Sequence, residues 1–316
     1  MSFRKVRFVD QALFLSSKFL GGFDLSGSCG GTLSFTSSVF HGSAVFRNAV
    51  FQEGARFEMV DFLEEASFAD VKFCMGTSFA RGRFRGRLRL WDVGFGEQKM
   101  AIDLGPVFRD CQFDEPVDFR SARFHGAFPE FSGAVLHAQT RFSSSADSWP
   151  HKTTQPPELA RDSCSTIRHI LAKQGLPEDE HFFFRKEMYF AGQIGSIWQR
   201  LPYLLFGLFS DYGHSIARPT FWLAGIWAFG FVAFWGYFSG CCVPAPLDVT
   251  ERPMGTAMGL SFSNLFPLFG FGRTFLAAEL AGLPAVLKTL AGFQTVFSLP
   301  LLFFLGLGLR QRFRLR

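Results

Sequence analysis

The residues of this sequence that could carry out acid–base, nucleophilic or metal chemistry are scattered rather than clustered. The 316 residues include seven histidines and six cysteines, and neither group shows HExxH spacing or paired metal ligands. Cys29 lies between glycines in GSCGG, but no histidine is marked as its base. The chain also lacks a Walker loop and a dinucleotide-binding glycine motif. The sequence therefore predicts no enzyme, no metal site and no cofactor.

Arginine is the other residue type whose spacing suggests a chemical role. In RGRFRGRLR it recurs at every second position, so an extended chain would place five arginines on one side. Such a row could contact phosphates or anionic lipid headgroups, or it could be a solvated face paired with Glu64, Glu65 and Asp92. The closing RQRFRLR offers a second basic cluster. The candidate lipid or partner contacts are Arg81, Arg83, Arg85, Arg87, Arg89, Arg310, Arg312, Arg314 and Arg316.

The element that carries the first arginine row is marked by a phenylalanine repeat. Steps of five and six residues alternate without a break through Phe35, Phe40, Phe46, Phe51, Phe57, Phe62, Phe68, Phe73, Phe79 and Phe84. A small or β-branched residue stands two positions before most of these rings. Neither the 3.6-residue period of a helix nor the two-residue period of a strand keeps such rings on one face. A coil with short straight sides and a turn at each corner does.

This pattern resembles the pentapeptide-repeat family, whose fold is a right-handed, four-sided β-helix, a quadrilateral β-solenoid. The family places a large residue at the centre of each side and a small one two positions earlier. In this chain the central residue is Phe, and every second unit has one extra residue, so that rings 22 positions apart, such as Phe35, Phe57 and Phe79, should stack. The resemblance implies a β-helix over residues 1–142, with an insertion at about 85–107.

After the repeat, residues 143–157 contain three prolines and predict a linker. Residues 158–210 predict a helical hairpin followed by an apolar interfacial helix. The cluster Phe182–Phe184 could pack within its own hairpin, on the end of the solenoid or on a second copy, and we expect packing within the hairpin.

Two segments in residues 211–316 are long and apolar enough to cross a membrane. Residues 219–239 and 289–309 each run for 21 residues without a charge, about 31 Å of helix. Arg218 precedes the first and four arginines follow the second, so the positive-inside rule places both termini in the cytoplasm. No export signal precedes the solenoid, and we expect it in the cytoplasm as well.

Between these spans, residues 254–275 are too short to cross and predict a re-entrant or interfacial element. Two spans around such an element resemble the two-helix potassium-channel module, and Gly270-Phe271-Gly272 resembles the end of its selectivity filter. Leu268-Phe269 departs from the Thr-Val of that filter. The residues of this candidate pore or re-entrant segment are Asn264, Pro267, Gly270, Phe271 and Gly272.

The order of these parts resembles bacterial membrane proteins that combine pentapeptide repeats with an ion-channel-like tail. The match is carried by Asp211-Tyr212-Gly213, Arg218-Pro219 and the closing arginines. It implies a multi-pass protein of the bacterial inner membrane. We expect it to act as a scaffold that binds membrane lipids and an unknown protein partner. The alternative is a subunit of a pore, which would require a homo-oligomer. Acidic and basic side chains balance over residues 1–147, 17 of each, so no nucleic-acid partner or mimicry is expected.

Overall fold

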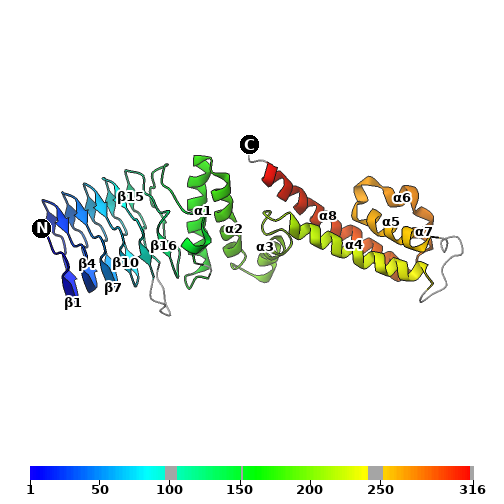
Figure 1. Ribbon diagram of the computed structural model, residues 1–316, viewed down its shortest axis with the longest axis horizontal. Helices are drawn as coiled ribbons and strands as arrows, with labels where there is room; N and C mark the ends of the chain where they lie inside the picture. The colour runs from blue at the N-terminus through cyan, green and yellow to red at the C-terminus, as the bar shows by residue number, and fades with distance from the viewer. Residues whose placement is uncertain (97–104, 151, 241–251, 314–316) are drawn as a thin grey trace. The chain divides into compact units, whose positions relative to one another are not determined.

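The computed structural model describes residues 1–96, 105–150, 152–240 and 252–313 (Figure 1). The chain divides into two compact units, Met1–Arg200 and Leu201–Arg316, and each is described by itself.

The first unit begins with a β-solenoid, in which short parallel strands stack coil upon coil (Figure 1). The strands are β1 (Arg7–Leu13), β2 (Lys18–Phe19), β3 (Phe23–Asp24), β4 (Cys29–Ser34), β5 (Val39–Phe40), β6 (Ala44–Val45), β7 (Val50–Arg56), β8 (Asp61–Phe62), β9 (Ala66–Ser67), β10 (Lys72–Phe73), β11 (Thr77–Ser78), β12 (Arg83–Phe84), β13 (Leu88–Arg89), β14 (Gly94–Phe95), β15 (Gln112–Phe113) and β16 (Arg123–Phe124). They form three sheets, ordered β1-β4-β7-β10-β14-β16 with β11 on β7, β15-β12-β8-β5-β2, and β13-β9-β6-β3. The β-solenoid expected from the repeat is confirmed.

Stacked phenylalanine rings fill the interior of the coils. Phe57 lies between Phe35 and Phe79, with ring centroids 5.3 and 5.1 Å away and the planes within 8° of parallel. The strand register agrees, because Phe51 pairs with Phe73 and Phe73 with Phe95. The predicted 22-residue stacking is therefore confirmed. Burying one such ring contributes about 2–3 kcal/mol, and each ring pair about 0.5–1.5 kcal/mol more.

The two step lengths of the repeat correspond to two kinds of corner. At steps of five the chain turns tightly through a residue in the left-handed region, such as Asn48 (φ 56°) or Asp70 (φ 57°), where Asn and Asp cost least. At steps of six the chain bends over a longer path, and this is where the extra residue lies. Gly86 stands at one such bend against the Glu64 backbone of the coil before, where a Cβ would clash.

The insertion begins after Phe95, not at residue 85 as the sequence suggested. Leu88 pairs with Ala66 and Phe95 with Phe73, so both remain in register with the preceding coil. The reason is that Leu88 and Leu90 occupy inward positions and are buried, although neither is the aromatic residue that marks the repeat. Residues 97–104 of the insertion lie outside the described residues.

A helical hairpin covers the last coils. It follows η1 (Ala146–Ser148) and consists of α1 (Pro157–Gln174) and α2 (Pro177–Ala191). Trp149 stacks on Phe124 at 4.8 Å, and Phe183 of α2 meets Trp149 edge-on at 5.0 Å. The expectation that the Phe182–Phe184 cluster packs only within the hairpin is therefore wrong for Phe183, because the open end of the ring stack offers it a larger apolar surface.

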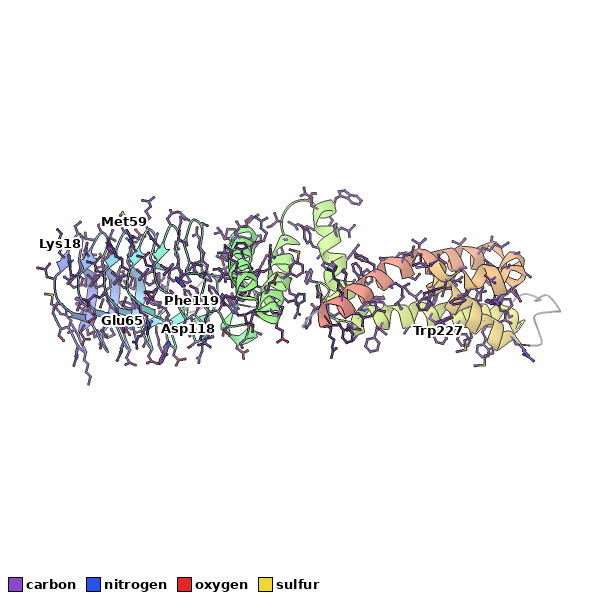
Figure 2. The ribbon with its side chains drawn as sticks, turned by 90° about the horizontal axis from the view of Figure 1, so that it is seen from above. Lys18, Met59, Glu65, Asp118, Phe119 and Trp227 are labelled. Atoms are coloured by element: carbon purple, nitrogen blue, oxygen red, sulfur yellow. The ribbon has the colours of Figure 1, made fainter. Side chains whose placement is uncertain are left out.

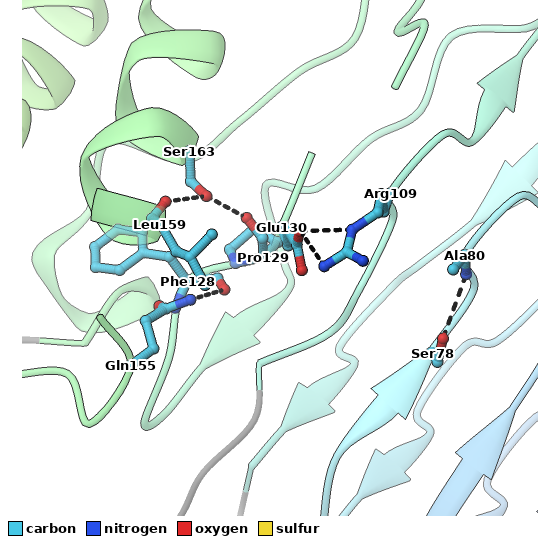
Figure 3. Close-up of polar contacts among 9 residues, drawn as sticks. All are labelled: Ser78, Ala80, Arg109, Phe128, Pro129, Glu130, Gln155, Leu159 and Ser163. Carbon is cyan, nitrogen blue, oxygen red and sulfur yellow. Dashed lines mark hydrogen bonds and ion pairs between the residues drawn. The ribbon is translucent and has the colours of Figure 1, made fainter. Parts of the chain in front are cut away.

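Polar contacts fix the hairpin to the same coils (Figure 3). The Ser163 hydroxyl lies 2.6 Å from the carbonyl oxygen of Pro129. The side-chain amide of Gln155 exchanges hydrogen bonds with both backbone groups of Phe128, at 2.6 and 3.2 Å. These bonds satisfy backbone groups that a following coil would otherwise pair.

The second unit is helical, and it begins at Leu201, within α3. The helices are α3 (Ile197–Ser210), α4 (Ala217–Phe238), α5 (Pro253–Leu265), η3 (Pro267–Phe269), α6 (Phe271–Phe275), α7 (Ala277–Gly282) and α8 (Ala285–Phe313). By length and composition, α4 and α8 are long and apolar enough to cross a membrane. They contain the two apolar segments identified in the sequence, except that α4 ends at Phe238, one residue before the first segment does.

The ring stack gives the first prediction. Phe57→Ala should lower the free energy of unfolding of the solenoid by about 3–5 kcal/mol, because it opens a cavity between two rings. Chemical denaturation of the purified protein, followed by far-ultraviolet circular dichroism, measures this loss. Lys72→Ala, at an exposed outward position of β10, is the matched control and should cost less than about 0.5 kcal/mol. Equal losses in the two variants would contradict the stacked core.

Candidate functional site

The first coil of the solenoid carries apolar side chains on its outer surface. We call Val9, Leu13, Leu15 and Leu20 the first-coil rim. Val9 is 84% and Leu20 77% exposed. Figure 2 marks this end of the solenoid by Lys18, which lies on β2 next to Phe19. Large exposed apolar side chains that gather on one part of a surface are typical of interaction sites.

Later coils place mostly polar residues at the positions of the rim. Leu13 pairs with Ser34, Ser34 with Arg56 and Arg56 with Ser78 along one column of the solenoid. Leu20 comes directly after Phe19, and Phe19 pairs in register with Phe40, Phe62 and Phe84 of the next three coils. The residues directly after those three rings are His41, Leu63 and Arg85. The repeat itself therefore does not require leucine at these positions. Sequence reasoning missed the rim, although a comparison with the residues 21 positions later, Leu13 with Ser34 and Leu20 with His41, would have found it.

The five arginines of residues 81–89 do not share one face. Arg83 belongs to β12 and Arg89 to β13, which lie in different sheets. Several are paired, since Arg85 contacts Asp61 at 2.9 Å and Arg89 contacts Glu65 at 3.0 Å. Arg83 contacts Asp114 at 3.7 Å. Exposed pairs of this kind contribute about 0–1 kcal/mol each. The row is broken because the chain turns a corner between β12 and β13.

Of the four arginines in residues 310–316, the structure describes Arg310 and Arg312. Arg310 and Arg312 lie in the last turn of α8 and are exposed, where they also interact favourably with the helix dipole. Arg314 and Arg316 lie outside the described residues. The contact of this cluster with anionic lipid remains a prediction.

Buried hydrogen bonds join α4, α5 and α8. Gln294 of α8 is fully buried, and its Nε2 donates to the carbonyl oxygen of Ile226 and to Ser261 Oγ, both at 2.9 Å. Ser261 Oγ donates to the carbonyl oxygen of Trp227 at 2.7 Å. Asn264 Nδ2 donates to Gln294 Oε1 at 3.0 Å. We call these side chains the Gln294 cluster. Asn264, which the sequence assigned to the candidate pore segment, thus joins α5 to α8.

Sequence reasoning did not single out Gln294 or Ser261. The available signal was a lone amide in the apolar segment 289–309, because polar residues in such segments usually bond to a neighbouring helix. Gly230 of α4 is the counterpart of Gln294, since a Cβ at this position would overlap the Gln294 amide.

The filter-like residues do not present a row of free carbonyl groups. Gly270 (φ 67°) ends η3, which Pro267 begins. The carbonyl oxygen of Gly270 accepts from the Thr274 amide at 3.1 Å, and that of Gly272 accepts from the Leu276 amide at 3.1 Å. Phe271 is the first residue of α6. Carbonyls engaged in helical turns cannot replace the hydration shell of an ion, so the structure does not reproduce the resemblance to a potassium filter.

Two of the cysteines are held as unreactive thiols. Burial raises the pKa of the Cys111 thiol to about 12, and Cys111 Sγ donates to the carbonyl oxygen of Phe79 at 2.9 Å. Burial also raises the pKa of Cys164, which lies on the buried face of α1 in the helical hairpin. A thiol of this kind stays protonated at neutral pH and is a poor nucleophile. Cys29 is only partly buried.

These thiols give the second prediction. In a Cys241→Ser, Cys242→Ser background, maleimide should react with Cys29 and leave Cys111 and Cys164 unmodified, as read by peptide mass spectrometry. Raising the pH to about 9 should not release Cys111, because its thiolate forms only toward pH 12. Unfolding in guanidinium should expose every cysteine. Rapid modification of Cys111 in the folded protein would contradict the burial.

The comparisons with known proteins address the repeat alone. Residues 35–81 match the family model described as pentapeptide repeats (9 copies). No curated protein and no solved structure matches the chain. The matched segment contains nine of the ten rings that follow one another in steps of five and six from Phe35 to Phe84, and the solenoid continues beyond it in the same register through Phe95. Over residues 35–81 the chain is thus a run of pentapeptide repeats folded as a β-solenoid.

Proposed function

We propose that this protein is a membrane-anchored interaction module, in which the solenoid binds a protein partner through its first-coil rim. The observation that carries the proposal is the contrast between Leu13 and the polar residues Ser34, Arg56 and Ser78 of its own column. Exposed leucine in water is unfavourable, and a partner that covers the rim gains about 25 cal/mol for each Å² of apolar surface that it buries.

The filled interior of the solenoid supports a binding role on the outside. Rings such as Phe57 and Phe79 are fully buried and lie in contact with their neighbours, so the coils leave no room for a ligand between them. Among the described residues, no group of His, Cys, Asp and Glu could hold a metal ion. A rigid solenoid with a packed core offers its regular outer surface to other proteins, and we propose no catalytic role.

The apolar surface of the second unit supports the anchor. Large side chains of α4 and α8 are exposed, among them Phe221, Phe229, Val232, Phe293, Val296 and Phe303. Such surfaces are stable against lipid and costly in water. With Arg218 in the first turn of α4 and Arg310 and Arg312 at the end of α8, the positive-inside rule favours cytoplasmic termini. We therefore propose a bacterial inner-membrane protein whose solenoid faces the cytoplasm.

The pore alternative receives less support. An ion path through residues 266–276 would need carbonyl oxygens that are free to face an axis. The carbonyl groups of Gly270 and Gly272 accept helical hydrogen bonds instead. Interaction, rather than conduction, is the function that the geometry favours.

The rim gives the third prediction. A photo-crosslinking residue placed at Leu13 should form a covalent adduct of defined mass in cells, whereas the same residue at Arg56 should not. The double change Leu13→Ser, Leu20→His takes the residues of the next coil. It should weaken the association at least about tenfold, since two buried leucines exceed the 1.4 kcal/mol that a factor of ten requires.

The matched control for the rim is Met59→Ser. Met59 is exposed on another coil and is marked in Figure 2, and its loss should leave the adduct intact. Equal adducts at residues 13 and 56, or an adduct that persists in the double variant, would contradict the rim as the docking surface.

The anchor gives the fourth prediction. In a cysteine-free background, Ser144→Cys and Arg312→Cys should react with a membrane-impermeant maleimide only after permeabilisation. Arg252→Cys, in the segment between α4 and α8, should react in intact spheroplasts. The reason is that the two helices would carry the chain out of the cytoplasm and back. Labelling of Ser144→Cys in intact spheroplasts would overturn the cytoplasmic placement of the solenoid.

A further inference from the structure

A cavity of about 780 Å³ lies among α5, α7 and α8, next to the Gln294 cluster. Much of its wall consists of small residues, including Gly270, Gly272, Ala277 and Gly292, so no large side chain fills it. Gly292 in particular has nothing within 4 Å of the position that a Cβ would take. A space of this size matches the pockets that hold small ligands.

The Gln294 cluster determines which atom of Asn264 remains available. The carbonyl groups of Ile226 and Trp227 can only accept, so Ser261 Oγ donates to one and Gln294 Nε2 to the other. Gln294 Oε1 therefore faces Asn264, which must donate through Nδ2. Asn264 lines the cavity with a side chain from a residue that is 9% exposed. Within the described residues, its Oδ1 accepts no hydrogen bond.

The other polar residues of the wall show what a ligand must supply. Thr295 and Ser263 already donate their hydroxyl protons to the carbonyl groups of Ala291 and Leu260. Lys288, which lines the cavity and is exposed, makes no ion pair with a described residue. Among the described side chains, the site thus combines the Lys288 cation with an acceptor on the buried residue Asn264. Lys288 and Thr295 are seven residues apart on α8, about 10 Å along the helix.

The surroundings of the cavity favour a lipid over a soluble anion. Leu268 and Phe269, which follow the lining residue Pro267, are both exposed, Leu268 by 82%. Val296, which lines the cavity, is also exposed, by 64%. A mouth bordered by such side chains is unfavourable in water. A molecule that enters it from lipid brings apolar chains to cover them.

We propose that this cavity binds an anionic phospholipid with a hydroxyl-bearing headgroup, whose phosphate pairs with Lys288 and whose hydroxyl donates to Asn264 Oδ1. The acyl chains lie against Val296 and the exposed apolar residues at the mouth. A zwitterionic choline headgroup lacks the hydroxyl donor and brings a cation toward Lys288, so it binds less well. The proposal rests on the membrane placement of the second unit.

The test uses the full-length protein in nanodiscs that contain equal amounts of phosphatidylglycerol and phosphatidylcholine. Native mass spectrometry after detergent release should detect retained phosphatidylglycerol in preference to phosphatidylcholine. Lys288→Gln removes the cation, and Gly292→Leu places a side chain in the cavity from a position where a Cβ meets no neighbouring atom. Each should reduce this retention about tenfold, the change that 1.4 kcal/mol gives. Arg218→Gln, a matched loss of a cation at α4, should leave it unchanged.

Three results would overturn the lipid site. Retention that is unchanged in both variants would exclude the cavity, and equal retention of the two lipids would exclude the headgroup contacts. Displacement by glycerol phosphate at the same concentration as the lipid would identify a soluble ligand instead. Carbonate extraction of membranes distinguishes failure of the lipid site from failure of the membrane placement. If the protein appears in the soluble fraction, both proposals are wrong. If it stays in the membrane but shows no lipid preference, only the lipid site is wrong.

Discussion

Stacking of one phenylalanine ring on the next is the interaction on which the solenoid depends. Parallel rings about 5 Å apart match the spacing of neighbouring strands in a sheet, so a ring and its backbone can repeat together. Phe35, Phe57 and Phe79 meet this condition, with planes within 8° of each other. Coils of 21 and 23 residues meet the same condition, since Phe14 stacks on Phe35 and Phe108 on Phe131, so the corners take up one residue more or less. The five-and-six spacing, the alternating corners and the glycine at Gly86 all follow from that constraint.

The same stack creates an end that must be covered. A ring inside the solenoid such as Phe57 has a stacked neighbour on each side, but the last rings have one free face. Trp149 covers Phe124, and Phe183 of α2 packs on Trp149. The core of the solenoid and the core of the hairpin therefore form one continuous cluster. The hairpin therefore stabilises the solenoid through a shared hydrophobic core, although the sequence of the hairpin does not contain the repeat.

The sequence predicted what depends on periodicity and missed what depends on which coils or helices meet. Ring spacing was enough to predict the solenoid and its register. The arginine row was misleading, because alternate positions share a face only while the strand continues, and the chain turns between Arg85 and Arg89. Arg85 pairs with Asp61 of the preceding coil, a contact that local spacing does not reveal. Gln294 was missed because its partners, Ile226 and Asn264, come from two other helices.

The two units use opposite means to specify a structure. In the solenoid, the shape of the side chains specifies the structure, because flat phenylalanine rings stack only when adjacent coils are in register. Among apolar helices in lipid, burial cannot fix a position, since lipid chains are as apolar as the helix surfaces. Hydrogen bonds then decide where a helix packs, and Gln294 supplies them to α4 and α5 at once. Within this cluster Asn264 donates through Nδ2 to Gln294, and its Oδ1 is left as an acceptor on a side chain that lines the cavity. In the proposed lipid site, the polar contact that orients α5 would also select the headgroup, which would couple ligand binding to helix position.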